Sequence, residues 1–281
     1  MAQEVTRIKK RIASVSGAYK VTSAMKLVST VKLGKWKTKM LNNREYTARI
    51  KSITDDALKN IGEISSPYFS DNINAKKNLY IVVSSTLGLC GSYNNNVFRV
   101  ADNVISENDD VIILGNKGYV HYADGAFQIL EGYKDYTSID NKKIITLLTE
   151  YVINEYVKGT YKSVHMVYSS YKNSLVFIPK DYQILPLINK NKEENAGYAP
   201  IMEPNKDELV NSIIPLYIKN VIYSLLLESE VSEHAARCNA MDNATNNAKD
   251  LLDNLKIQFN KARQNTITQE ITEIVGASKA L

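Results

Sequence analysis

The chain has 281 residues, of which 44% are hydrophobic and 23% are charged, an ordinary balance for a globular protein of one large domain or two medium ones. It contains no run of about 18 apolar residues, and the N-terminus lacks the apolar core of a signal peptide, so we expect neither a membrane span nor a secretory leader. The net charge of +5 is uneven, because residues 1–60 hold fourteen Lys and Arg but four Asp and Glu, a balance of +10 that leaves −5 for the rest. This basic segment predicts an acidic partner, which could be nucleic acid, an anionic membrane or an acidic protein surface.

The first segment is predicted to be one long helix over residues 3–60, because no proline occurs before Pro67. Its apolar residues recur in alternating steps of three and four, which is the spacing of a coiled-coil seam. A phase slip is expected after Tyr19, where a second apolar row takes over. The first row is Val5, Ile8, Ile12, Val15 and Tyr19, and the second is Val21, Met25, Val28 and Val31, with Ala24 beside them.

The middle of the chain alternates strand and helix patterns. A helix is predicted over residues 139–158, and another follows the glycine-rich stretch at 86–94. The order strand, helix, strand implies a mostly parallel sheet that is covered by helices. The predicted strands cover residues 79–84, 111–115, 126–130, 163–168 and 175–185, the last one interrupted at Pro179.

The last segment contains neither proline nor glycine between Pro215 and Gly276. Such a stretch allows a helix about 90 Å long, whereas a domain of ~130–150 residues is only roughly 30 Å across, so the helix should project from any globular body. Its seam is again spaced by three and four, with a slip near the end. The seam residues are Ala248, Leu252, Leu255, Phe259 and Ala262, followed after the slip by Ile267, Ile271 and Ile274.

The two terminal segments are expected to pair with each other, because isolated helices with one apolar stripe are marginal in water. The sequence therefore predicts an α/β fold, in which a long antiparallel coiled coil of the N- and C-terminal helices joins a central Rossmann-like α/β domain with a mostly parallel sheet. The predicted boundaries are 1–62 and 207–281 for the coiled coil, 76–188 for the central domain and 189–206 for a connecting loop.

Candidate chemical groups are few. The stretch from Thr86 to Asn94 follows a strand and precedes a helix, but its spacing fits neither a P-loop nor a dinucleotide fingerprint, and a tight turn is the favoured interpretation. Cys90 has no base nearby in sequence, and His165 is expected to lie in the core. We therefore expect no catalytic residues, no metal site and no cofactor. The basic helix lacks the interleaved aromatic residues that stack on bases, so nucleic acid is not expected as a partner.

Four motifs together resemble the γ subunit of F-type ATP synthases. They occur in the order expected for that family, and the C-terminal ones are highly specific. The motifs are Ile8–Val15 with Tyr19–Val28, then Gly88–Gly91 with Asn94, then Val231–Ala248, and finally Phe259–Gly276.

The resemblance implies a noncatalytic rotor shaft inside a ring of three α and three β subunits, where ATP chemistry takes place on the partners. It implies that Met25 and Lys26 face a β-subunit lever near Arg237. It also implies contacts of the upper shaft with β-subunit catch loops, and these levers and loops carry acidic residues in the family. The residues carried over to the catch-loop contacts are Arg263, Gln264, Thr268 and Glu270.

The sequence departs from the family at Thr86 and Leu87, where an Asp and a basic or polar residue are usual. The resemblance implies an ε-type subunit and a membrane rotor ring as further partners. The departure at Thr86 and Leu87 puts these two partners in question and leaves open the alternative of a γ-like shaft of a specialised ATPase that performs mechanical work. A coiled-coil scaffold or a nucleic-acid-binding protein is the remaining alternative. With two cysteines in unrelated contexts, we expect a cytoplasmic protein, peripheral at the inner face of a bacterial membrane.

Overall fold

A computed structural model describes residues 2–59, 67–69, 72, 74–123, 125, 127–187 and 206–279. The chain divides into two compact units. The two-helix unit comprises Met1–Thr30 and Arg237–Leu281, and the α/β unit comprises Val31–Ala236. Helices α1 (Ala2–Lys59) and α5 (Lys206–Lys279) each contribute to both units, which confirms the long terminal helices. The predicted border at residue 62 and most of the predicted connecting loop 189–206 lie outside the described residues, and the predicted domain division stays a prediction.

The α/β unit contains a five-stranded sheet in the order β3-β2-β1-β4-β5, which confirms the mostly parallel arrangement. The pairs β1–β2, β1–β4 and β2–β3 are parallel, whereas β4–β5 is antiparallel. Three helices complete this unit: α2 (Tyr93–Val104), α3 (Asn116–His121) and α4 (Lys142–Val157). The strands are β1 (Lys77–Val83), β2 (Asp110–Leu114), β3 (Gln128–Ile129), β4 (Tyr161–Tyr171) and β5 (Phe177–Leu185).

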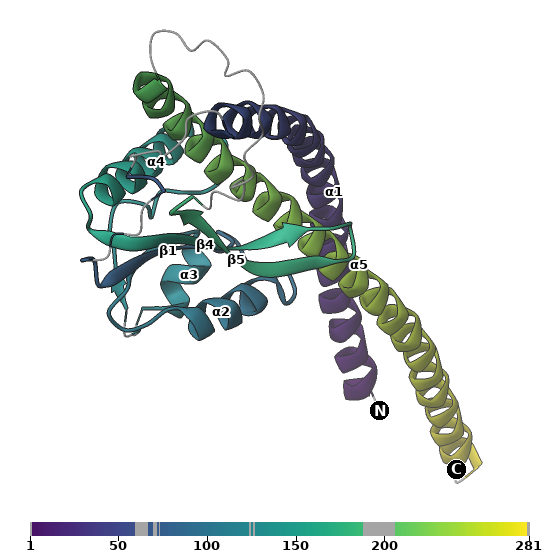
Figure 1. The fold of residues 1–281 in the computed structure, drawn as a ribbon. Helices are drawn as coiled ribbons and strands as arrows, with labels where there is room; N and C mark the ends of the chain where they lie inside the picture. The colour runs from purple at the N-terminus through teal and green to yellow at the C-terminus, as the bar shows by residue number, and fades with distance from the viewer. Residues whose placement is uncertain are drawn as a thin grey trace. The chain divides into compact units, whose positions relative to one another are not determined.

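Both faces of this sheet are covered, and β1 shows why. Successive side chains of a strand point to opposite faces. Leu79 and Ile81 belong to the core shared with α4, the start of α5 and Trp36 of α1, whereas Tyr80 and Val82 belong to a second core under α2. Figure 1 shows α2 and α3 on one side of the sheet and α4 on the other. A strand buried on both faces is apolar throughout, which is why the pattern Leu-Tyr-Ile-Val-Val was recognisable.

Helix α3 has no counterpart among the predicted elements. It follows Gly115, whose φ is 96° and whose Cβ position would lie 2.1 Å from the carbonyl oxygen of Ser84. Only glycine fits there. With six residues, α3 is too short for its periodicity to identify it from sequence.

Two predicted limits of elements are corrected by the structure. Helix α4 begins at Lys142 rather than at 139, because the side chain of Asn141 accepts a hydrogen bond from the Ile144 amide and caps the helix. Strand β5 runs through Pro179 without interruption, since an edge strand tolerates a missing amide donor. Helix α5 includes Pro215, as the predicted segment 207–281 does.

The predicted phase slip in α1 is wrong. Val21, Val28 and Val31 are exposed by 58%, 57% and 67%. Along α1, the less exposed residues recur in steps of three and four without a break. After Tyr19, however, the next three of these residues are polar. They are Thr22, Lys26 and Ser29, after which Leu33, Trp36 and Met40 resume the apolar row in the α/β unit.

The slip predicted near the end of α5 is also wrong. Ile267, Ile271 and Ile274 are exposed by 47%, 56% and 69%, so they do not continue a seam within this chain. The seam residues Ala248, Leu252, Phe259 and Ala262 are half-buried, and Leu255 is buried. Extended toward the N-terminal side in the same steps, the row passes through Thr245, Met241 and Cys238.

Candidate functional site

Three polar pairs join α1 to α5 inside the two-helix unit. The two helices are antiparallel here, so a partner further toward the C-terminus of α1 pairs with a residue further toward the N-terminus of α5. The pairs are Lys26 Nζ with Asp242 Oδ1 at 2.5 Å, Thr245 Oγ1 with Thr22 Oγ1 at 3.0 Å, and Thr30 Oγ1 with Cys238 Sγ at 3.3 Å. A polar pair at a coiled-coil seam specifies register, because a shifted alignment would leave its members unpaired.

Lys26 and Asp242 form the charged member of this set. Their side chains are 44% and 43% exposed. The hydrogen bond and the charge of Asp242 raise the pKa of Lys26, so the ammonium stays charged. The structure thus gives Lys26 a partner within its own chain, in addition to the β-subunit contact that the resemblance implies.

Met25 and Arg237 lie in the same unit but differ in exposure. Met25 is half-buried beside Lys26, and Arg237 is only 5% exposed. A partner would therefore reach Met25 directly and Arg237 only over a small part of its surface. Both β-subunit contacts remain predictions.

The four residues predicted to meet the catch loops lie on the last third of α5, and all four are exposed. They are Arg263, Gln264, Thr268 and Glu270. The antiparallel register, extended from Lys26–Asp242, sets Thr266 level with Ala2 at the start of α1. Thr268 and Glu270 lie beyond that level on α5, and both are exposed.

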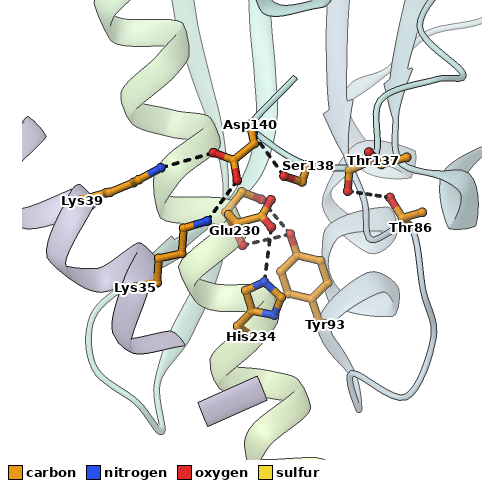
Figure 2. Close-up of polar contacts among 10 residues, drawn as sticks. Lys35, Lys39, Thr86, Tyr93, Thr137, Ser138, Asp140, Glu230 and His234 are labelled. Atoms are coloured by element: carbon orange, nitrogen blue, oxygen red, sulfur yellow. Dashed lines mark hydrogen bonds and ion pairs between the residues drawn. The ribbon is translucent and has the colours of Figure 1, made fainter. Parts of the chain in front are cut away.

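In the α/β unit, α1 is tied to the segment before α4 by a charged cluster (Figure 2). Asp140 accepts hydrogen bonds from Lys35 and Lys39, both at 3.2 Å. Each ammonium also lies over the ring of Trp36, at 4.7 and 4.4 Å from its centroid. Partial burial raises the pKa of Asp140, but the hydrogen bonds and charges of the two lysines together hold it below its usual value.

A second polar group in Figure 2 ties α5 to α2. The hydroxyl of Tyr93, at the start of α2, lies 2.7 Å from that of Ser229. One turn further along α5, the buried His234 lies 3.3 Å from Glu230. Burial, aided by the nearby charge of Glu233, raises the pKa of Tyr93 well above its usual value. These contacts hold neutral Tyr93 in place.

The glycine-rich stretch is a tight turn, as the favoured interpretation had it. Leu89 and Gly91 have φ of 63° and 59°. Asn94 closes the turn, since its side chain accepts from the Ser85 amide at 2.9 Å and donates to Ser85 Oγ at 2.8 Å and to Cys90 Sγ at 3.3 Å. The side chains of Ser85 and Asn94 thus form hydrogen bonds within the turn.

His165 is not the core residue that its strand position suggested. It is half-buried on one face of β4, with Nδ1 3.0 Å from Asp181 and Nε2 3.0 Å from Ser163 Oγ. Residues two apart on a strand share a face, so β4 supplies both Ser163 and His165. Among the described residues, no group of three His, Cys, Asp or Glu side chains could hold a metal ion.

Sequence reasoning missed Asp242, Thr245 and Asp140, which supply four of the five polar contacts of α1 described above. The uninterrupted spacing of three and four would have identified Thr245 as a seam residue, whereas Asp242 lies beside that row, next to Met241. Asp140 carries no such signal, because its partners lie about a hundred residues away along the chain.

None of the described helices has the length and apolar content that crossing a membrane requires.

Comparison with known proteins places the chain in a family. The sequence profile of the ATP synthase family matches residues 4–281. The ATP synthase gamma chain of Mesoplasma florum is 33% identical, over 99% of this chain and 98% of that protein. The gamma chain of Mycoplasma mobile is 35% identical over 98% of each, and that of Pelotomaculum thermopropionicum is 36% identical over 98% of each.

Solved structures agree on the fold. A chain of the Euglena gracilis mitochondrial ATP synthase, from its OSCP/F1/c-ring assembly in rotational state 3, superposes with a TM-score of 0.65 at 20% identity, covering 100% of this chain and 95% of that one. A chain of the same enzyme's rotor, in rotational state 1, gives a TM-score of 0.63 at 18% identity, covering 95% and 100%. On the profile match and on relatives that align along nearly their whole length, the chain belongs to the ATP synthase gamma chain family.

Proposed function

We propose that this chain is the central rotor shaft of a rotary ATP synthase or ATPase, and that it couples rotation to ATP synthesis or hydrolysis on surrounding α and β subunits. Family membership supports this role. In this proposal the chain is noncatalytic: its described polar groups form structural pairs, and the ATP chemistry takes place on the partners.

The observation that carries the proposal is the row of exposed apolar residues on the two-helix unit. In a pair of helices, each helix buries only the face that contacts the other, so apolar residues on the remaining faces stay exposed. Val21, Leu27 and Val28 on α1 are 57–67% exposed, and Ile267, Ile271 and Ile274 near the end of α5 are 47–69% exposed. Apolar rows of this size mark an interaction surface, and a ring of partners around the two helices would cover them.

The proposed contacts follow the two ends of this unit. Met25 and Lys26, with Arg237 beneath the surface, would meet the β-subunit levers. Further along α5, the exposed side chains would meet the catch loops, and beyond them the apolar tip would turn in an apolar sleeve. The catch-loop residues are Arg263, Gln264, Thr268 and Glu270.

Coupling follows from the asymmetry of such a shaft. Three chemically identical sites around two unlike helices each face a different surface, so their nucleotide affinities differ at any one angle. A free energy then links the shaft angle to the state of each site, and because linkage is reciprocal, nucleotide binding also biases the angle. Rotation in one direction drives synthesis, and hydrolysis drives the reverse.

Further partners are proposed for the α/β unit. By analogy with the Euglena assembly, whose name includes F1 and a c-ring, a membrane rotor ring would bind there. The ε-type subunit is proposed from the family resemblance alone. The complex would then sit at the inner face of a bacterial membrane, with this chain peripheral to it. The exposed Leu87 stands where the family usually has a polar residue, and this difference keeps a specialised ATPase as the alternative.

Affinity purification of the tagged full chain from its native cell tests the proposal. We expect α and β subunits in threefold excess over this chain, with ATPase activity in the recovered complex. Recovery of the chain without them would refute the rotor role. Membrane ring subunits in the same fraction support the synthase, whereas an active complex without any ring supports the specialised ATPase.

A further inference from the structure

Five polar side chains form a continuous row across the sheet, from the residue before β2 to the edge strand β5. Each lies within hydrogen-bond distance of the next, and we call the five the sheet network. Its members are Asp109 before β2, Asn78 on β1, Ser163 and His165 on β4, and Asp181 on β5. The row lies on the face of the sheet that α2 covers, because His165 is the direct β4 partner of Tyr80 in the core under α2.

The network crosses β4 where the backbone ladders on both of its sides are irregular. The pairing of β1 with β4 shifts register between Lys77 and Leu79, around Asn78. The pairing of β4 with β5 shifts between Val164 and His165. A bulge disrupts the ladder and redirects side chains. At these two places the side chains of the network therefore link strands whose backbone pairing is weakened.

The direction of each hydrogen bond follows from Asp109. Its two carboxylate oxygens accept from the Ser106 amide at 2.9 Å and from the backbone and side-chain amides of Asn78 at 2.8 and 3.1 Å. The side chain of Asn78 therefore turns its NH2 toward Asp109 and its oxygen toward Ser163. A hydroxyl has one proton, which Ser163 donates to Asn78 at 2.8 Å, so the Ser163 oxygen can only accept from His165.

Both ring nitrogens of His165 must then be donors. Nε2 donates to Ser163 Oγ at 3.0 Å, and Nδ1 lies 3.0 and 3.1 Å from the two oxygens of Asp181. A neutral imidazole has one N–H, whereas the imidazolium has two. If the ring is neutral and Ser163 turns its proton to Nε2, the oxygen of Asn78 loses its donor. Only the doubly protonated ring completes the network.

The same three residue types form the catalytic triad of serine hydrolases, but here the proton directions differ. In a triad the serine donates its proton to the histidine. Ser163 instead donates to Asn78, and its oxygen accepts from His165. The arrangement suits the binding of a charged histidine rather than the activation of a nucleophile.

Two carboxylates and one phenol lie on this face with His165. The ring of Tyr80 lies 5.1 Å from that of His165, and the carboxylates are those of Asp109 and Asp181. Burial, followed by the charges of these two carboxylates, raises the pKa of Tyr80 to about 12, so Tyr80 stays neutral at physiological pH. Helix α2, which packs over this face, has two charged residues, and both are exposed. They are Arg99 and Asp102.

We infer that the sheet network is a proton-sensitive link that holds β5 to the sheet, closed while His165 carries two ring protons and open when it loses one. This role is independent of the rotor role, because all five residues lie within the α/β unit. The link would open as the pH rises through the range of about 5 to 8 in which histidine changes charge. The contact of β5 with α5 would then loosen, since Phe177 at the start of β5 packs against Cys90, Tyr93 and Ala236.

Hydrogen exchange of the full chain, read by mass spectrometry from about pH 5 to about pH 8, tests this link. After correction for the pH dependence of exchange itself, the amides of β5 should lose about three- to tenfold in protection as the pH rises, the factor expected for one lost hydrogen bond. The amides of α4, on the other face of the sheet, should keep their protection.

Matched variants locate the effect. Asp181→Asn keeps the shape of the side chain, and its amide can donate to a neutral ring or accept from it, so the pH dependence of β5 should disappear. His165→Gln removes the titrating ring and should have the same effect. His121→Gln removes an exposed histidine whose ring stacks on Phe98, outside the network, and should leave the pH response of β5 unchanged.

Nitrogen NMR of the full chain, labelled in its histidine rings, reports the protons directly. The signals of His165, identified by their absence in His165→Gln, should show two protonated nitrogens where β5 is protected and one where β5 has lost protection. Loss of the ring proton without a change in β5 would overturn the inference. A ring that keeps the same number of protons across the whole range would overturn it as well, and so would an unaltered pH response of β5 in Asp181→Asn.

Discussion

Lys26 of α1 and Asp242 of α5 form an ion pair in a stretch where the seam between the two helices is polar. The hydroxyl pair of Thr22 and Thr245 lies one turn away. Apolar seam residues slide past one another at little cost, whereas a shifted register would leave a charge without its partner. This pair therefore specifies the alignment of the two helices more than it adds to stability.

A double-mutant cycle tests that role. We expect Lys26→Ala and Asp242→Ala each to lower the melting temperature of the full chain slightly, and the double variant to lose less than the sum of the two losses, because the partners interact. Lys256→Ala removes an exposed pair within α5 alone and serves as the control. Strict additivity of the two single changes would show that the pair does not couple the helices.

Leu255 is the one residue of the C-terminal seam row 248–262 that is fully buried, at 3% exposed. Leu255→Ala should lower the free energy of unfolding by about 2–5 kcal/mol, as lost apolar burial and a residual cavity add together. Ile257, two residues away and 67% exposed, gives a matched control, and Ile257→Ala should stay within about 0.5 kcal/mol. Denaturant unfolding of the full chain measures both. Equal losses at the two positions would mean that the seam is not packed as described.

Met25→Lys should lower coupling more than assembly. The residue is half-buried next to Lys26, and a longer cationic side chain there would reach an acidic lever of the ring and form an additional ion pair that resists rotation. The measurement is ATP-driven ion pumping divided by the ATPase rate in membrane vesicles. Val120→Lys, at a 65% exposed position on α3, is the control for an added charge. An unaltered ratio in the Met25 variant would argue against the lever contact.

The cluster around Asp140 should make stability depend on pH. The two lysines hold the pKa of Asp140 below the usual 3.8. The Asp140 carboxylate therefore adds its full contribution to the free energy of unfolding above pH 3.8, and this contribution is lost as the pH falls through the lower pKa of the folded state. Asp140→Asn should therefore cost about 0.2–1 kcal/mol per exposed pair at neutral pH, and the difference from the unmodified chain should fade below about pH 4.

Denaturant unfolding across this pH range checks the prediction. Glu107→Gln, at an exposed position without an ion pair among the described residues, is the control and should show no such dependence. A difference in the free energy of unfolding between Asp140→Asn and the unmodified chain that persists at pH 3 would contradict a stabilising role for the Asp140 charge.

Much of the fold could be predicted because its signals are local. The buried strand β1, the breaker-free helices and the heptad rows were all recognisable from spacing alone. The two phase slips were misread because apolarity was taken as the mark of a seam. At Thr22, Lys26 and Ser29 the seam continues with polar residues, and the apolar residues beside them face outward.

The candidate site was less predictable, for a physical reason. Lys26 and Asp242 are separated by 216 residues and come together only through the antiparallel register. Their ion pair therefore leaves no pattern in either helix alone. The same argument applies to Asp140, because its partners Lys35 and Lys39 on α1 are about a hundred residues away in the sequence.

Direct observation of rotation tests the central claim. A bead attached to Leu175→Cys, at a 78% exposed position between β4 and β5, would report the motion of this chain in a complex whose β subunits are fixed to a surface. If the chain is the shaft, the bead turns in one direction when ATP is added and stops when ATP is removed. Complexes that hydrolyse ATP at full rate while the bead shows no directed rotation would contradict the account.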